Sequence, residues 1–243
     1  MIGAVRHNPA TVVVLAGQPG EQVLAAIGRS LNVVVIQPES SRGAGNAAKA
    51  AGTEPAGIEA AAGALRRAAG ISAPYVLVAA DPLREVAAAW QAMWLLSAEP
   101  QRTDEFELRA AEAMGAWRAK RFELPDYYLV LADDGAAGGA AGAPGASSGS
   151  TNSGGTSGPG GPGAGEGRVD FYLGPLRAVR PNRVAVAAGA TPAAQADALL
   201  SELGSLRPGP WWPPLDQVLG TARGFYPGSL TESPAAGQAS LLR

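Results

Sequence analysis

Four short, continuously apolar runs, separated by longer helix-like stretches, constrain the fold of this chain more than any other feature. The runs are residues 11–16 (TVVVLA), 33–36 (VVVI), 75–79 (YVLVA) and 127–132 (YYLVLA). Successive side chains of a strand point to opposite faces, so an unbroken apolar run indicates a strand buried on both faces. The intervening stretches, residues 21–30, 57–69, 83–97 and 103–121, have the length and periodicity of helices. This alternation predicts an α/β fold with an open, mainly parallel, Rossmann-like sheet and helices on both faces.

The second half of the chain has a different composition. Residues 135–165 consist almost wholly of Gly, Ala, Ser, Pro and Thr, and we expect a disordered linker there because such a segment buries too little apolar surface. After it, residues 169–173 and 183–188 resemble strands and residues 192–204 a helix. The predicted organisation is a Rossmann-like domain (1–134), the linker (135–165), a continuation of the α/β domain (166–206) and an irregular Pro/Gly-rich tail (207–243).

Composition excludes several classes of function. The chain has no cysteine, so it cannot form disulfides or hold an iron–sulfur cluster through thiolates. Its single histidine, His7, precedes the first strand and leaves little for a zinc site or a Ser–His–Asp triad. With 19 basic and 21 acidic residues, the chain lacks the charge excess of a nucleic-acid-binding surface.

The sequence also predicts a location. It contains neither a recognisable signal peptide nor an apolar run of about 18 residues, the length needed to span a bilayer. We therefore expect a cytoplasmic protein without direct membrane insertion, or one held at the inner face of the membrane by partners.

A ligand site is expected where the parallel strands end. In open parallel sheets, ligands bind outside the carboxyl ends of the strands. The polar loop at 37–46 (QPESSRGAGN) follows the second strand, and its Ser40, Ser41 and Arg42 suit a phosphate or an amide edge. The residue types alone leave open whether this loop binds a ligand or only turns the chain.

The other strand-end loops carry weaker signals. Gly17-Gln18-Pro19-Gly20 lacks the Gly-Lys-Ser/Thr ending of a phosphate-binding loop, so a plain turn is expected. Asp81 precedes Pro82 and suits the N-cap of the next helix, although a ligand contact is the alternative. Asp133 and Asp134 are either solvated or a metal-binding pair.

Two groups of aromatic residues invite a functional interpretation. Val86, Trp90 and Trp94 lie four residues apart, which places them on one helix stripe and favours core packing. The Trp211–Trp212 pair stands between prolines, and Tyr226 precedes Pro227. These residues dock the tail onto its own domain or form a protein-interaction module.

Two segments resemble the molybdopterin oxidoreductase family. "VVVIQPESSRGAGNAAKAAGTEP" is similar to a family strand followed by Asn-Ser-x-Gly-Ala, and "SAPYVLVAADPL" is similar to a later strand ending in Gly-Ala/Ser-Asn/Asp-Pro. The likeness covers roughly residues 9–135 and is closest to the large iron–sulfur subunit of NADH-quinone oxidoreductase, the respiratory complex I. Formate dehydrogenase-like large subunits are the other candidates.

The resemblance implies a cofactor cleft. In the family's active members, the matching loops contact the nucleotide part of molybdopterin guanine dinucleotide. The positions implicated here as cofactor-binding are Ser40, Ser41, Arg42, Gly43, Asp81 and Pro82.

The chain departs from the family pattern at two positions, with Ser40 in place of the family's Asn and Ala79 in place of its Gly. The resemblance therefore implies a scaffold subunit or accessory of a respiratory or formate-linked redox complex, without its own redox centre. Other subunits of that complex would be its partners. The alternative is a stand-alone domain that binds a nucleotide-like small ligand.

Overall fold

The computed structural model describes residues 10–17, 19–38, 57–95, 101–132 and 168–225. Within them, five strands form one all-parallel sheet in the order β2-β3-β1-β4-β5. The strands are β1 (Thr11–Ala16), β2 (Val33–Ile36), β3 (Tyr75–Val78), β4 (Tyr127–Ala132) and β5 (Val184–Ala188). The predicted parallel α/β sheet is thus confirmed. Its order differs from the dinucleotide-binding order in that β3, not β2, lies beside β1.

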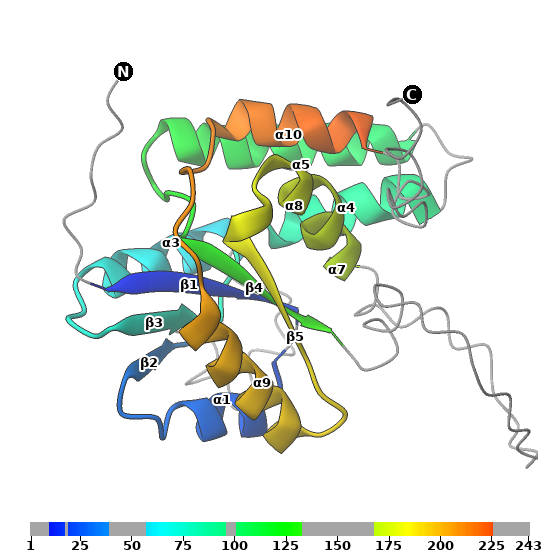
Figure 1. Cartoon of the computed structure of the whole chain (residues 1–243). Coiled ribbons are helices and arrows are strands. Elements are labelled where there is room, and N and C mark those ends of the chain that lie inside the picture. The colour runs from blue at the N-terminus through cyan, green and yellow to red at the C-terminus, as the bar shows by residue number, and fades with distance from the viewer. Residues whose placement is uncertain (1–9, 18, 39–56, 96–100, 133–167, 226–243) are drawn as a thin grey trace, which may run out of the picture.

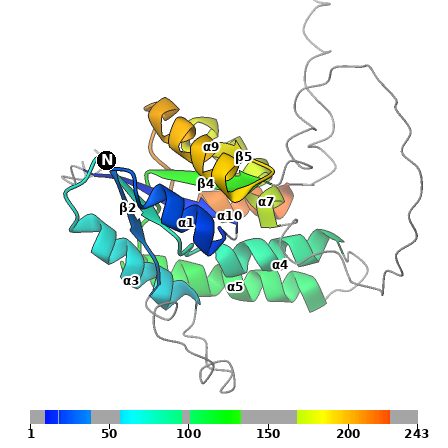
Figure 2. The same cartoon turned by 90° about the horizontal axis from the view of Figure 1, so that it is seen from below.

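Helices cover both faces of the sheet (Figures 1 and 2). On one face lie α1 (Glu21–Ile27) and α9 (Pro192–Ser205). On the other lie α3 (Gly57–Ala69), α4 (Arg84–Leu95), α5 (Gln101–Arg118), α7 (Arg168–Phe171), the π-helical turn η2 (Tyr172–Leu176), α8 (Arg177–Val179) and α10 (Leu215–Gly224). A 3₁₀ turn, η3 (Pro181–Arg183), leads into β5. None of the described helices is both long and apolar enough to cross a membrane.

The central strands have the burial that their sequences predict. All six residues of β4 are buried, as are five of the six in β1. Alternate residues of each strand join different cores, so that Val13 and Leu15 pack toward α1 and α9 while Val12 and Val14 pack toward α4 and α5. The Trp90 side chain is buried in the core between the sheet and helices α4 and α5, and Trp94 packs against this core. The predicted core packing of the Val86, Trp90 and Trp94 stripe is thus confirmed.

The strand predicted at residues 169–173 is wrong. This segment forms α7 and the start of η2. Its buried residues Val169, Tyr172 and Leu176 recur at i, i+3 and i+7, which is a helical spacing. Pro175, which breaks an ordinary α-helix, lies inside the wider π-helical turn.

The prediction of an irregular tail over 207–243 is also wrong in part. Residues 215–224 form α10, which buries Leu215, Val218, Leu219 and Ala222, again at i, i+3, i+4 and i+7. Asp216 in the first turn and Arg223 in the last complement the helix dipole. The linker predicted at 135–165 and the tail after residue 225 lie outside the described residues.

Arg183 fastens the segment between α9 and α10 across the amino end of the sheet. It is the one basic side chain that is buried among the described residues. Its guanidinium donates to the backbone carbonyls of Asp126 (3.0 Å), Gly209 (2.7 Å) and Pro210 (3.1 Å). The rings of Tyr127 and Trp211 lie 5.0 and 4.9 Å from its central carbon. We call residues 207–214, held in this way, the strap.

Replacing Arg183 by lysine tests the importance of this contact. A lysine ammonium keeps the charge but cannot match the planar fork that reaches three carbonyls and stacks between two rings. We expect the R183K variant to lose about 2–4 kcal/mol of unfolding free energy in urea, because buried carbonyls lose their donors. Arg118→Lys, at an exposed site on α5, is the matched control, and an equal small loss in both variants would contradict the proposed role of Arg183.

Candidate functional site

The carboxyl ends of the central strands form the part of the fold most suited to a ligand. The chain leaves β1 for α1 on one face of the sheet, whereas it leaves the neighbouring strands β3 and β4 for α4 and α7 on the other. Such a reversal between adjacent strands is the place where ligands bind in open α/β sheets. The strand arrows in Figure 1 point toward this edge.

Asp81 follows β3 at this edge and ties three elements together. Its Oδ1 accepts a hydrogen bond from the Leu83 backbone N–H at 2.9 Å, which closes the turn into α4. Its Oδ2 accepts a hydrogen bond from the hydroxyl of Tyr172 in η2. Helix α4 begins at Arg84, so Asp81 closes the turn before the helix and is not its N-cap, and Pro82 is not its first residue as predicted. The carboxylate also anchors η2 to the end of β3.

A second tyrosine, Tyr128 of β4, lies beside this contact. Its ring is 5.5 Å from that of Tyr172 and its hydroxyl is fully buried. The Tyr128 hydroxyl has no hydrogen-bond partner of good geometry among the described residues, although the Asp81 carboxyl is close enough to affect its pKa. A buried hydroxyl whose hydrogen bond is poorly formed is unusual, and a water or a ligand that completed its hydrogen bonding would be stabilised there.

Burial sets the protonation of this group of residues. It raises the pKa of Asp81 from its ordinary 3.8 to about 6, although hydrogen bonds from Tyr172 and Leu83, the charge of Arg84 and a weaker hydrogen bond from Tyr128 act in the opposite direction. Burial and the nearby Asp81 raise the pKa of Tyr128 well above its ordinary value. Asp81 therefore changes charge near neutral pH, while Tyr128 remains a neutral hydroxyl.

The chemistry available here is hydrogen bonding to a neutral or donor-bearing ligand. A carboxylate has about four lone-pair sites, and Asp81 uses two of them for Leu83 and Tyr172. An amine, amide or hydroxyl group of a ligand fits the remaining acceptor capacity. A phosphate does not fit beside this carboxylate, because the two negative charges repel each other.

The predicted cofactor-binding residues are described only in part. Ser40, Ser41, Arg42 and Gly43 lie outside the described residues, as do His7 and the Asp133–Asp134 pair. Asp81 and the buried Pro82 are described, and both lie in the turn between β3 and α4. The 37–46 loop begins at the described residues Gln37 and Pro38, directly after β2 at the same sheet edge.

Gly17 shows that the first strand-end loop makes a tight turn. Its φ of 110° is one that residues with side chains rarely adopt, and a Cβ there would lie 3.2 Å from the Cβ of Leu131. The chain thus turns closely over β4 before α1. At Gly20 no side chain caps α1, and the helix has only seven residues.

The tryptophans of the tail pack onto their own domain. Trp212 is buried, donates its indole N–H to the Pro125 carbonyl at 2.8 Å and lies 5.8 Å from the Tyr128 ring. Trp211 remains 43% exposed against Arg183. Docking onto the domain, one of the two alternatives for this pair, is therefore what the structure shows, whereas Tyr226 and Pro227 lie outside the described residues.

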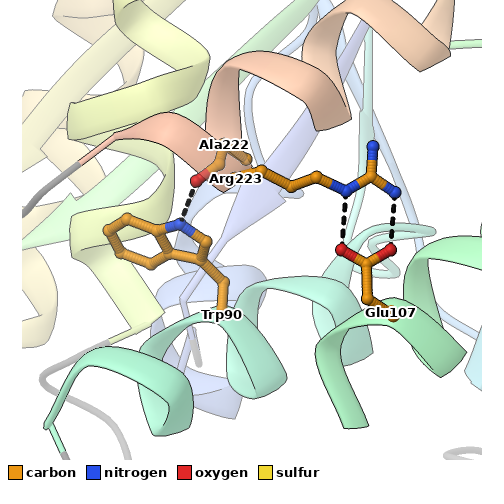
Figure 3. Close-up of polar contacts among 4 residues, drawn as sticks. All are labelled: Trp90, Glu107, Ala222 and Arg223. Carbon is orange, nitrogen blue, oxygen red and sulfur yellow. Dashed lines mark hydrogen bonds and ion pairs between the residues drawn. The ribbon is translucent and has the colours of Figure 1, made fainter. Parts of the chain in front are cut away.

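Helix α10 is held by two polar contacts (Figure 3). The indole N–H of Trp90 on α4 donates to the Ala222 carbonyl at 2.7 Å. The Arg223 guanidinium pairs with both carboxylate oxygens of Glu107 on α5, at 2.6 and 2.7 Å. Directly after α10, Phe225 covers Gly174 so closely that a Cβ there would lie 2.8 Å from the ring. The C-terminal segment thus supports η2, which carries Tyr172 to Asp81.

Neither a metal site nor a similarity to known proteins assigns a further function to these residues. Within the described ranges, no group of three or more His, Asp or Glu side chains is arranged to hold a metal ion. Comparisons with protein-family models, curated proteins and solved structures found no significant match for this chain.

Replacing Asp81 by asparagine tests its protonation. The folded protein keeps the Asp81 proton up to about pH 6, whereas the unfolded chain loses it near pH 3.8, so ionisation favours unfolding. Between pH 4 and pH 6 we expect the wild type to lose about 2 kcal/mol of unfolding free energy relative to D81N, because one titrating group contributes at most about 1.4 kcal/mol per pH unit. Urea unfolding at each pH measures the difference, and parallel curves for the two proteins would rule out a raised pKa.

Proposed function

We propose that this chain is a binding domain for a nucleotide-like small ligand, whose nucleoside part contacts Asp81 at the carboxyl edge of β1, β3 and β4. The observation that carries the proposal is the buried Tyr128 hydroxyl, which lacks a well-formed hydrogen bond although it lies beside the Asp81 carboxyl of raised pKa. Perturbed titrating groups at the carboxyl ends of parallel strands are typical of functional sites.

The chemistry of the site supports a nucleoside. Asp81 accepts hydrogen bonds, and the amino groups of purines and the hydroxyls of ribose donate them. In the dinucleotide-binding fold, an acidic residue binds ribose hydroxyls in the same way. Phosphates would lie away from Asp81, toward the loop that contains Arg42.

A thermal-shift titration with guanosine, adenosine, GTP and ATP tests the proposal. A ligand present at 100 times its dissociation constant adds about 2.7 kcal/mol of stability and raises the melting temperature. We expect at least one of the four to raise it in the wild type but not in D81N. Arg118→Glu, on the far end of α5, is the control and should keep the response. No shift with any of the four would contradict the proposal.

The resemblance supports a second candidate, a molybdopterin-oxidoreductase-like scaffold in a respiratory or formate-linked redox complex. The Ala80-Asp81-Pro82 loop, which follows β3 after Ala79, is consistent with this resemblance. A tagged chain that copurifies with redox subunits would favour this candidate. A purified sample without pterin, molybdenum or such a partner would exclude it.

A further inference from the structure

Strand β5 forms an open edge of the sheet. It pairs with β4 on one side, and on its other side the described residues contain no further strand. Ala185, Val186 and Ala188 are only half-buried. An edge strand presents alternate backbone N–H and C=O groups that an added strand can pair with.

A groove runs along this edge between the two helical layers. It encloses a cavity of about 450 Å³. Leu173 and Arg177 line it on the side of η2 and α8, and Leu206 and Arg207 line it on the side of α9. Val184 and Val186 of β5 form its floor. The groove therefore combines an apolar floor with an unpaired strand edge.

The groove carries a net positive charge. The Arg177 and Arg207 side chains are exposed and form no ion pair within the described part of the chain. The Tyr127 hydroxyl donates to the Arg207 carbonyl at 2.9 Å, which holds the backbone of this arginine in place. Glu202 is the single acidic residue of the lining, and it accepts a hydrogen bond from the Ser205 hydroxyl at 3.3 Å.

We propose that this groove binds an acidic peptide in extended conformation, which pairs with β5 as a sixth strand. The backbone of such a peptide would satisfy the β5 edge, its apolar side chains would contact Val184 and Val186, and its carboxylates would pair with Arg177 and Arg207. The two arginines stand on opposite sides of β5, and neighbouring residues of a strand point to opposite faces. Two adjacent acidic residues in the peptide therefore match them.

A second copy of the chain fits this groove less well. Its β5 has the sequence VAVAA and brings no carboxylate, and it would add its own two arginines to the interface. This site lies apart from the carboxyl-edge site at Asp81, and its test does not depend on the nucleoside proposal.

The probe is a fluorescein-labelled Thr-Val-Glu-Glu-Val-Thr peptide, whose palindromic order can pair in either direction. At low salt we expect saturable binding by fluorescence anisotropy. The Arg177→Glu/Arg207→Glu double variant should weaken it about tenfold or more, because two attractive pairs become repulsive. The matched control, Arg29→Glu/Arg118→Glu, makes the same change of net charge away from the groove and should leave binding within about twofold.

Three further peptides separate strand pairing from simple charge attraction. Thr-Val-Lys-Lys-Val-Thr should not bind. Of the two acidic peptides that are methylated on alternate backbone amides, the one that loses its donors to β5 should not bind, whereas the other keeps those donors. Equal binding of the unmethylated peptide and both methylated peptides would overturn the proposal. No saturable binding at millimolar peptide would also overturn it, and so would a chain that sediments as a dimer through β5.

Discussion

The contact between Arg183 and the strap is the interaction on which the arrangement of the second half of the chain depends. It joins the amino end of β5 to a segment that must pass from the α9 face of the sheet to the α10 face. Three carbonyls and two aromatic rings surround a charge that would otherwise be costly to bury. With the strap in place, Trp212 enters the core next to Tyr128 and α10 lies on α4 and α5.

The candidate ligand site depends on this arrangement through a chain of contacts. Helix α10 and Phe225 cover η2 at Gly174, η2 supplies Tyr172, and the Tyr172 hydroxyl holds Asp81 at the end of β3. The aromatic rings of Tyr128, Tyr172, Phe171 and Trp90 form a continuous series in the same core. The packing that stabilises the fold therefore also fixes the geometry of the Asp81 carboxyl and raises its pKa.

The elements that sequence patterns predict well here are those whose burial is local and complete. Strands β1 and β4 are apolar on both faces, and α3 begins and ends at the predicted residues. The helical spacing of Val169, Tyr172 and Leu176 was hidden by Gly174 and Pro175, and that of α10 by the prolines and glycines around it. In both segments the i, i+3, i+7 recurrence was the signal to follow.

The site itself was predictable only in part. The pattern of Asp81 and Pro82 is local and indicates the turn that leads into α4. The convergence of Tyr128 and Tyr172 on Asp81 requires the strand order and the π-helical turn, and neither can be derived from local sequence.

The dependence of the fold on the strap can be measured by the equilibrium unfolding in urea of a chain that ends at Leu206. The strap and α10 bury Trp212, Leu215, Val218 and Leu219, each worth about 1.5–3 kcal/mol, which together match a typical unfolding free energy of about 5–15 kcal/mol. We predict that the shortened chain shows no cooperative unfolding transition, while a chain that ends at Phe225 retains that of the full-length protein. A shortened chain that unfolds cooperatively, within about 1 kcal/mol of the full-length value, would show that the fold does not depend on the strap.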